Sequence, residues 1–129
     1  ILPQSNRFGR MDDYSKLGTL AIALALQDAG IDEWSEKRPI GVIATTVTGS
    51  LSADMDFFNT VIPQDGLLAS PKLFVYTLPS SFLGEATIRF GLTGGSFVVN
   101  EEHPSCLSSI RMAIENISWG ENEIMLAGF

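Results

Sequence analysis

The fold of this chain is decided by the stretch Phe90-Gly91-Leu92-Thr93-Gly94-Gly95-Ser96-Phe97-Val98-Val99-Asn100-Glu101-Glu102-His103-Pro104-Ser105-Cys106-Leu107. Its glycines predict turns, and the run at residues 96–100 predicts a short strand. Proline is well tolerated at the first position of a helix, so Pro104 predicts a helix start with His103 as its N-cap. The stretch therefore indicates a turn, a strand and the beginning of a helix.

The residues after this stretch continue the alternation of helix and strand. Apolar residues recur at intervals of three and four and predict a helix that runs to about Trp119 and is closed by Gly120. These apolar positions are Leu107, Ile110, Ala113, Ile114 and Ile117. The short run at residues 124–128 then predicts a final buried strand.

The residues before the stretch follow the same plan. The β-branched run at residues 40–46 is typical of a central strand that is buried on both faces of a sheet. Residues 12–29 predict a helix, with acidic residues at its start and Gly30 after its end. Its wide apolar face leads us to expect deep burial; the face comprises Leu17, Leu20, Ala21, Leu24 and Ala25.

The remaining segments connect these elements. Residues 51–62 predict a helix with Met55, Phe58 and Val61 or Ile62 on one side, and residues 63–70 a loop. Pro71 begins a short helical turn, and a serine at 80 or 81 caps a helix that runs to Phe90. The chain is thus predicted to be α/β, with a mainly parallel sheet covered by helices. We expect one domain over residues 1–129, with residues 1–10 as an arm.

Bulk properties exclude several classes of function. The net charge of −7, from 15 acidic and 8 basic residues, argues against a nucleic-acid partner. No apolar run approaches the ~20 residues of a membrane helix, and residues 1–7 lack the apolar core of a signal peptide. The single cysteine fits a reducing compartment, so a cytoplasmic location is expected. Because the first residue is not Met, we expect the chain to be trimmed or incomplete.

Motifs along nearly the whole chain resemble the N-terminal half of the β-ketoacyl synthases, the condensing enzymes of fatty-acid and polyketide synthesis, which have the thiolase-like fold. The resemblance covers the segments at residues 10–17, 25–31, 39–43, 78–81, 90–107 and 119–128. In the family the nucleophile segment reads roughly G-L-T-G-P, a short strand, then T-A-C-[SA]-S-[GS]-L. Each motif is weak alone, but their order and spacing make the family resemblance strong.

The resemblance implies that the cysteine of this pattern is the acylated nucleophile. In a gap-free overlay Leu107 falls on the pattern's leucine and His103 falls on its cysteine, while Gly95 replaces the usual proline. The family's first strand, and its C-terminal half with two catalytic histidines, have no counterpart in these residues. The resemblance therefore implies a synthase-like protein that is not catalytic as a condensing enzyme, similar to the cysteine-less chain-length factors of polyketide systems.

The candidate catalytic residues are His103, at the family's nucleophile position, and Cys106. Cys106 lies three residues later, a shift of roughly 4.5 Å and 300° on a helix, so a buried structural role is preferred for it. For His103 we prefer an N-cap or interface role. The aromatic residues at 57, 58, 74, 76 and 82 are more typical of core than of an acyl tunnel. No cofactor or metal is expected, since a single histidine without further ligands does not predict a metal site.

Three classes of function remain open from the sequence. The chain is a non-catalytic synthase-like subunit, an enzyme that uses His103 or Cys106 for acyl transfer, decarboxylation or hydrolysis, or an interaction module without an acyl ligand. The resemblance implies an acyl carrier protein or a synthase-like subunit as partner, and an oligomer through Ser96–Asn100 and the following helix. Carrier docking would need basic residues, for which the candidates are Arg7, Arg10, Lys16, Lys37, Arg38 and Lys72.

Overall fold

The computed structural model describes residues 7–31, 36–103 and 107–129. Three parallel strands form its sheet, in the order β2-β1-β3. They are β1 (Ile40–Thr46), β2 (Ser96–Asn100) and β3 (Ile124–Gly128). β1 pairs on one side with β2, where Thr46 lies opposite Asn100, and on the other with β3, where Ala44 lies opposite Gly128. The prediction of an α/β chain with a parallel sheet is confirmed.

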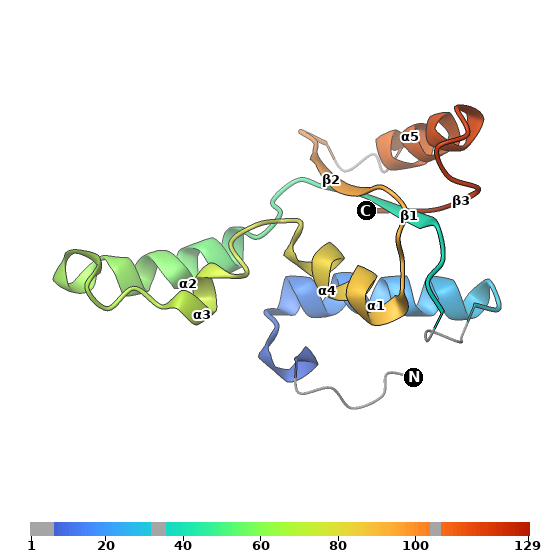
Figure 1. The fold of residues 1–129 in the computed structure, drawn as a ribbon. Helices are drawn as coiled ribbons and strands as arrows, with labels where there is room; N and C mark the ends of the chain where they lie inside the picture. Colours follow the sequence, from blue (N-terminus) through green and yellow to red (C-terminus); the bar gives the residue numbers. More distant parts are fainter. Residues whose placement is uncertain (1–6, 32–35, 104–106) are drawn as a thin grey trace.

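Helices cover the two faces of the sheet unequally. On one face lie α1 (Asp13–Asp28) and α4 (Ser81–Phe90), which pack against each other, and on the other lies α5 (Leu107–Ser118), which packs against β3 and β1 (Figure 1). None of the described helices is long and apolar enough to cross a membrane. The predicted elements are therefore present, and α5 is described from Leu107 because residues 104–106 lie outside the described residues. The expected burial of the strand at residues 124–128 is wrong: β3 is an edge strand of the described sheet, none of its residues is buried, and Ile124 is 45% exposed.

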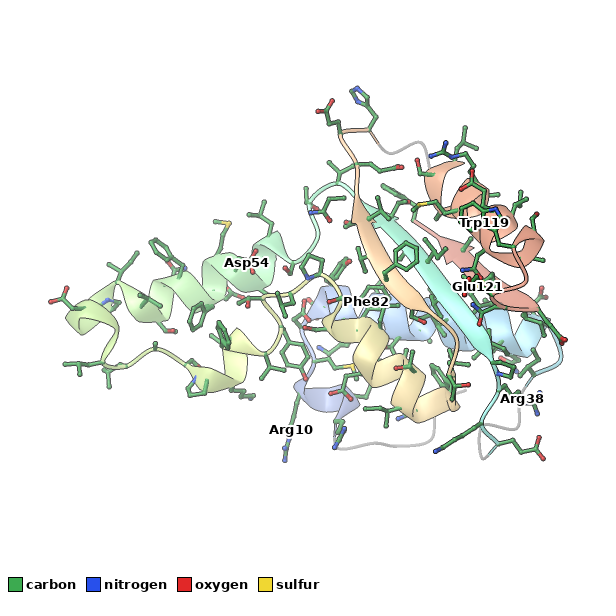
Figure 2. The ribbon with its side chains drawn as sticks, turned by 45° about the horizontal axis from the view of Figure 1, so that its top comes forward. Arg10, Arg38, Asp54, Phe82, Trp119 and Glu121 are labelled. Atoms are coloured by element: carbon green, nitrogen blue, oxygen red, sulfur yellow. The ribbon has the colours of Figure 1, made fainter. Side chains whose placement is uncertain are left out.

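The main core lies between β1, α1 and α4. Phe90 is only 2% exposed, and it packs in one cluster with Leu26, Ile40 and Phe82. Phe82 comes from the first turn of α4 (Figure 2), and its ring meets the ring of Tyr14 edge-on at 5.5 Å between centroids. This cluster fixes the α1–α4 layer on its face of the sheet.

The prediction for the buried face of α1 is wrong. The helix buries Ser15, Thr19, Ile22, Ala23 and Leu26, whereas Leu17, Ala21, Leu24 and Ala25 are exposed. The reason is close packing, since an added Cβ on Gly18 would lie 2.5 Å from the Phe82 ring. Small side chains therefore face α4 at the start of the helix, and part of the longer apolar set is left uncovered.

A hairpin of helices projects from one end of this body (Figure 1). It contains α2 (Leu51–Val61), a 3-10 turn η2 (Pro63–Gly66) and α3 (Pro71–Phe74), and α2 packs against both of the other elements. The Phe57 and Phe74 rings lie 5.3 Å apart, and the Ser70 N–H donates to the Thr60 hydroxyl. Much of the hairpin's apolar surface, including Met55, is nevertheless exposed.

The segment at residues 7–10, expected to belong to an arm, contains the 3-10 turn η1 (Phe8–Arg10). Phe8 packs beside a small buried cluster of Met11, Ala53 and Tyr76. Arg7 also forms an ion pair with Glu85 on α4, with 3.6 Å between nitrogen and oxygen. These contacts attach the described part of the segment to the body of the protein; residues 1–6 of the predicted arm lie outside the described residues.

Candidate active site

The turn before β2 places the candidate segment on the sheet. The Gly94 N–H donates to the Ile40 carbonyl at 3.1 Å, and a Cβ on Gly94 would clash with the backbone of residues 40–41 and with Asn122. The Val42 N–H in turn donates to the Gly95 carbonyl at 3.3 Å. The glycine pair therefore serves a close backbone approach, which agrees with the interpretation of residues 93–95 as a tight turn.

The residues after β2 lead to the candidate site. The Glu101 N–H donates to the Thr46 carbonyl at 2.9 Å, so the pairing of β2 with β1 continues one residue beyond the strand. His103 follows two residues later and is exposed. Because the strands are parallel, this segment lies at the carboxyl edge of the sheet, where open α/β sheets commonly bind ligands.

The local charge of this segment is negative. Glu101 and Glu102 directly precede His103, and one carboxylate oxygen of Glu101 is buried without a hydrogen-bond partner among the described residues. A neighbouring carboxylate repels a second negative charge, so it disfavours the thiolate form of a thiol placed here. The second candidate, Cys106, lies outside the described residues, so the structure does not bring it together with His103.

The inner and outer sides of α5 differ in character. Ser109 and Ala113 are buried against the sheet, which lets the helix approach it closely. The opposite side carries an exposed apolar row, here called the outer stripe. It consists of Leu107 (67% exposed), Ile110 (47%), Ile114 (60%) and Ile117 (45%). Trp119, just beyond the helix, is also exposed (Figure 2). The predicted apolar spacing is therefore correct, but most of it faces away from the protein's own core.

The aromatic residues considered for an acyl tunnel do not form one lining. Phe57, Phe58 and Phe74 belong to the projecting hairpin, where the last two are exposed. Tyr76 and Phe82 are buried in two different clusters. No described residues group three or more His, Cys, Asp or Glu side chains in a way that could hold a metal ion.

The candidate basic residues for carrier docking are partly neutralised. Arg7 pairs with Glu85, Lys16 with Asp13 at 3.1 Å and Arg38 with Glu36 at 3.5 Å. These are surface pairs, each worth little to stability. Their carboxylates nevertheless reduce the positive potential that an acidic partner would meet.

Comparison with known proteins places this geometry in a family. Residues 4–128 match the model of the family described as beta-ketoacyl synthase, N-terminal domain. A polyketide beta-ketoacyl synthase 1 of Streptomyces virginiae is 30% identical over 137 residues, which cover 99% of this chain and 31% of that protein. Nodulation protein E of a Rhizobium species (strain N33) is 27% identical over 123 residues, which cover 92% of this chain and 30% of that protein.

A solved structure has the same fold. It is a type II polyketide synthase acyl carrier protein in complex with its ketosynthase, bound to the hexaketide (AntDE:AntF). The match has a TM-score of 0.67 and 20% identity, and it covers 94% of this chain and 32% of the matched chain. This chain thus spans about a third of the length of the proteins that it matches. Because the family model matches almost every residue, the chain belongs to the β-ketoacyl synthase family, to whose N-terminal domain it corresponds.

Proposed function

We propose that this chain is a non-condensing member of its family, which acts in fatty-acid or polyketide synthesis by pairing with a synthase-like subunit. The observation that carries the proposal is the outer stripe of α5, because the described residues leave this row of four large apolar side chains uncovered, and such a row favours an interface. His103, at the family's nucleophile position, supports the part of the proposal that the chain does not catalyse condensation.

His103 lacks the chemistry that condensation needs. In the family a thiolate at the start of the helix accepts the acyl group, and helix N–H groups lower the thiol pKa and stabilise the oxyanion. The imidazole of His103 has no sulfur atom, so it cannot form the acyl thioester on which condensation depends. The acidic residues Glu101 and Glu102 further oppose an anion at this edge of the sheet.

The partner is more consistent with a synthase-like subunit than with an acidic carrier protein. The chain itself is acidic, and Arg7, Lys16 and Arg38 already pair with carboxylates. By contrast, no strand of the described sheet pairs with the outer edge of β2, so this edge can accept a strand of another subunit. The outer stripe adds exposed apolar surface. Strand pairing at Ser96–Asn100 and burial of the outer stripe are two contacts that such a subunit could make.

Intact mass measurement tests the absence of acyl transfer. The chain is incubated with short- and long-chain acyl-CoA and with acyl carrier protein, beside the Cys106→Ala and His103→Ala variants. No adduct is expected on any of them. An adduct on the native chain that disappears in Cys106→Ala would instead identify an active thiol enzyme with a displaced nucleophile. An adduct lost only in His103→Ala would identify a histidine enzyme.

A pair of single-thiol variants tests whether residue 103 occupies the nucleophile position. In the Cys106→Ala background, His103→Cys places the thiol before α5, and Ser118→Cys places it on the last residue of the same helix. Glu101 and Glu102 disfavour a thiolate at the first site, but the helix dipole favours it there and opposes it at the second, and we expect the dipole to dominate this comparison. We expect the first thiol to be acylated and alkylated faster. Equal rates would contradict the assignment of residue 103.

A further inference from the structure

A hollow of about 380 Å³ lies between α1 and the sheet. One wall is the side of α1 that includes Gly18, Ala21 and Ala25, and the other is formed by residues 42–48 and 126–129. Its volume falls within the range of ~300–1,000 Å³ that is common for small-molecule sites. This α1 hollow lies on the face of the sheet opposite α5, so it is separate from the outer stripe.

The α1 hollow is long for its volume. Its α1 wall runs from Tyr14 to Ala25, about three helical turns or roughly 16 Å at 1.5 Å per residue. Small side chains on α1 keep the helix from filling the space, while the Phe82 ring packs over Gly18 at one side. An elongated shape of this kind suits a chain better than a compact ring system.

The buried side-chain hydroxyls in the walls of the α1 hollow all have hydrogen-bond partners. The Tyr14 hydroxyl donates to the Pro79 carbonyl at 3.2 Å, and the Thr45 hydroxyl donates to the Gly128 carbonyl at 3.3 Å. The Thr46 hydroxyl accepts from the Gly49 N–H at 2.9 Å. The one other hydroxyl, that of Thr48, belongs to an exposed residue, and no described side chain of the lining carries a formal charge at neutral pH.

The uncharged, mainly apolar lining of the α1 hollow determines which class of ligand it can bind. A charged group placed in the α1 hollow would lose its hydration and gain no ion pair, whereas a hydrocarbon would gain burial in proportion to its area. We propose that the α1 hollow binds the alkyl chain of a neutral amphiphile and leaves its polar end in solvent. This goes beyond the proposed function, because the site shares no residue with the nucleophile position or the outer stripe.

The test uses 1-decanol as the probe, with decanoate and 1-hexanol as comparators. Methyl-labelled protein is titrated, and the NMR shifts of alanine methyls in the α1 hollow, Ala21 and Ala25, are followed. We expect saturable shifts with 1-decanol and at least tenfold weaker binding of the charged and the short comparators. Ala21→Phe fills the hollow from an exposed position and is expected to weaken binding at least tenfold, whereas the matched control Ile88→Phe on α4 leaves it unchanged.

Three outcomes overturn the proposal. Shifts that do not saturate, or that appear equally at Ala113 on α5, would show nonspecific contact. Binding that survives Ala21→Phe would place the ligand elsewhere. Concentration-dependent shifts of Ala21 and Ala25 in the ligand-free chain would show that a second copy of the chain, rather than an amphiphile, covers the hollow.

Discussion

Substitution of Ile114 by serine tests the role of the outer stripe most directly. Full burial of an isoleucine side chain is worth ~1.5–3 kcal/mol. Because Ile114 is 60% exposed in the free chain, an interface that buries it would gain roughly 1–2 kcal/mol from this side chain. Since each 1.4 kcal/mol changes a dissociation constant tenfold, Ile114→Ser is expected to weaken association by roughly 5- to 30-fold per interface copy.

The matched control for this substitution is Ile88→Ser. Ile88 lies on α4, on the opposite face of the sheet, and is 74% exposed. The two variants make the same chemical change on an exposed helix position, so differences in helix propensity cancel. Both should retain the circular dichroism spectrum and the melting temperature of the native chain to within a few degrees.

With a second copy of the chain taken as the synthase-like subunit, sedimentation velocity over a concentration series measures the effect on self-association. The native chain and Ile88→Ser should share one dissociation constant, and Ile114→Ser should shift the association curve to higher concentration. A native chain that stays monomeric at high concentration refutes self-association. Equal weakening by both variants would show that the association is nonspecific and does not depend on α5.

Three further predictions concern the core, the first helix and the pH dependence. Phe90→Ala should lower the free energy of unfolding in urea by about 3–5 kcal/mol, because it opens a cavity in the main core. Asp12→Ala should cost about 0.5–2 kcal/mol in the same assay, since the Asp12 carboxylate accepts hydrogen bonds from the N–H groups of Tyr14 and Ser15 and caps α1. Burial raises the pKa of the Tyr14 hydroxyl, as does the charge of Asp12 to a lesser extent. Its stabilising effect should therefore be complete below the unfolded pKa of about 10 and be lost as pH rises through the folded pKa. The melting temperature of the native chain should accordingly fall more between pH 9 and pH 11 than that of Tyr14→Phe, and equal falls would contradict the assignment.

Local patterns in the sequence predicted most of the elements. The run at residues 40–46 identified the central strand because a strand covered on both faces needs apolar residues at every position. Gly91 and Gly120 marked the ends of α4 and α5, where both adopt positive φ angles. These signals are local, since they depend on the backbone and on periodicity rather than on distant contacts.

The side on which a helix is buried could not be predicted in the same way. On α1 the buried positions include Ser15 and Thr19, because α4 approaches closely and the Phe82 ring occupies the space over Gly18. On α5 the sheet accepts Ser109 and Ala113, while the larger Ile114 faces out. Where two elements approach closely, small side chains therefore pack inward beside apolar ones such as Leu26, and this size matching is a property of two segments together.

The candidate site was only partly accessible to prediction. The sequence predicted the glycine turn and the strand at residues 96–100 that precede His103, and the structure adds that this segment lies at the carboxyl edge of a parallel sheet. The α1 hollow was not predicted from the sequence. The apolar residues of α1 do extend around more than one face of the helix, which indicates a second apolar surface beside the one that packs in the core. A helix with apolar residues on two sides must pack against another surface on each side to bury them. The described residues cover only one side of α1.

The position of β1 in the sheet also bears on how the chain acquires its structure during synthesis. β1 is made before both of its partner strands, since Thr46 pairs with Asn100 on one side and Ile40 with Ile124 on the other. Both partners leave the ribosome long after β1, and contacts at such large sequence separation form slowly. Until then β1 is an apolar strand with two open edges, which is the kind of segment that aggregates and that chaperones bind. The yield of folded protein should therefore depend on protection of residues 40–46 during translation.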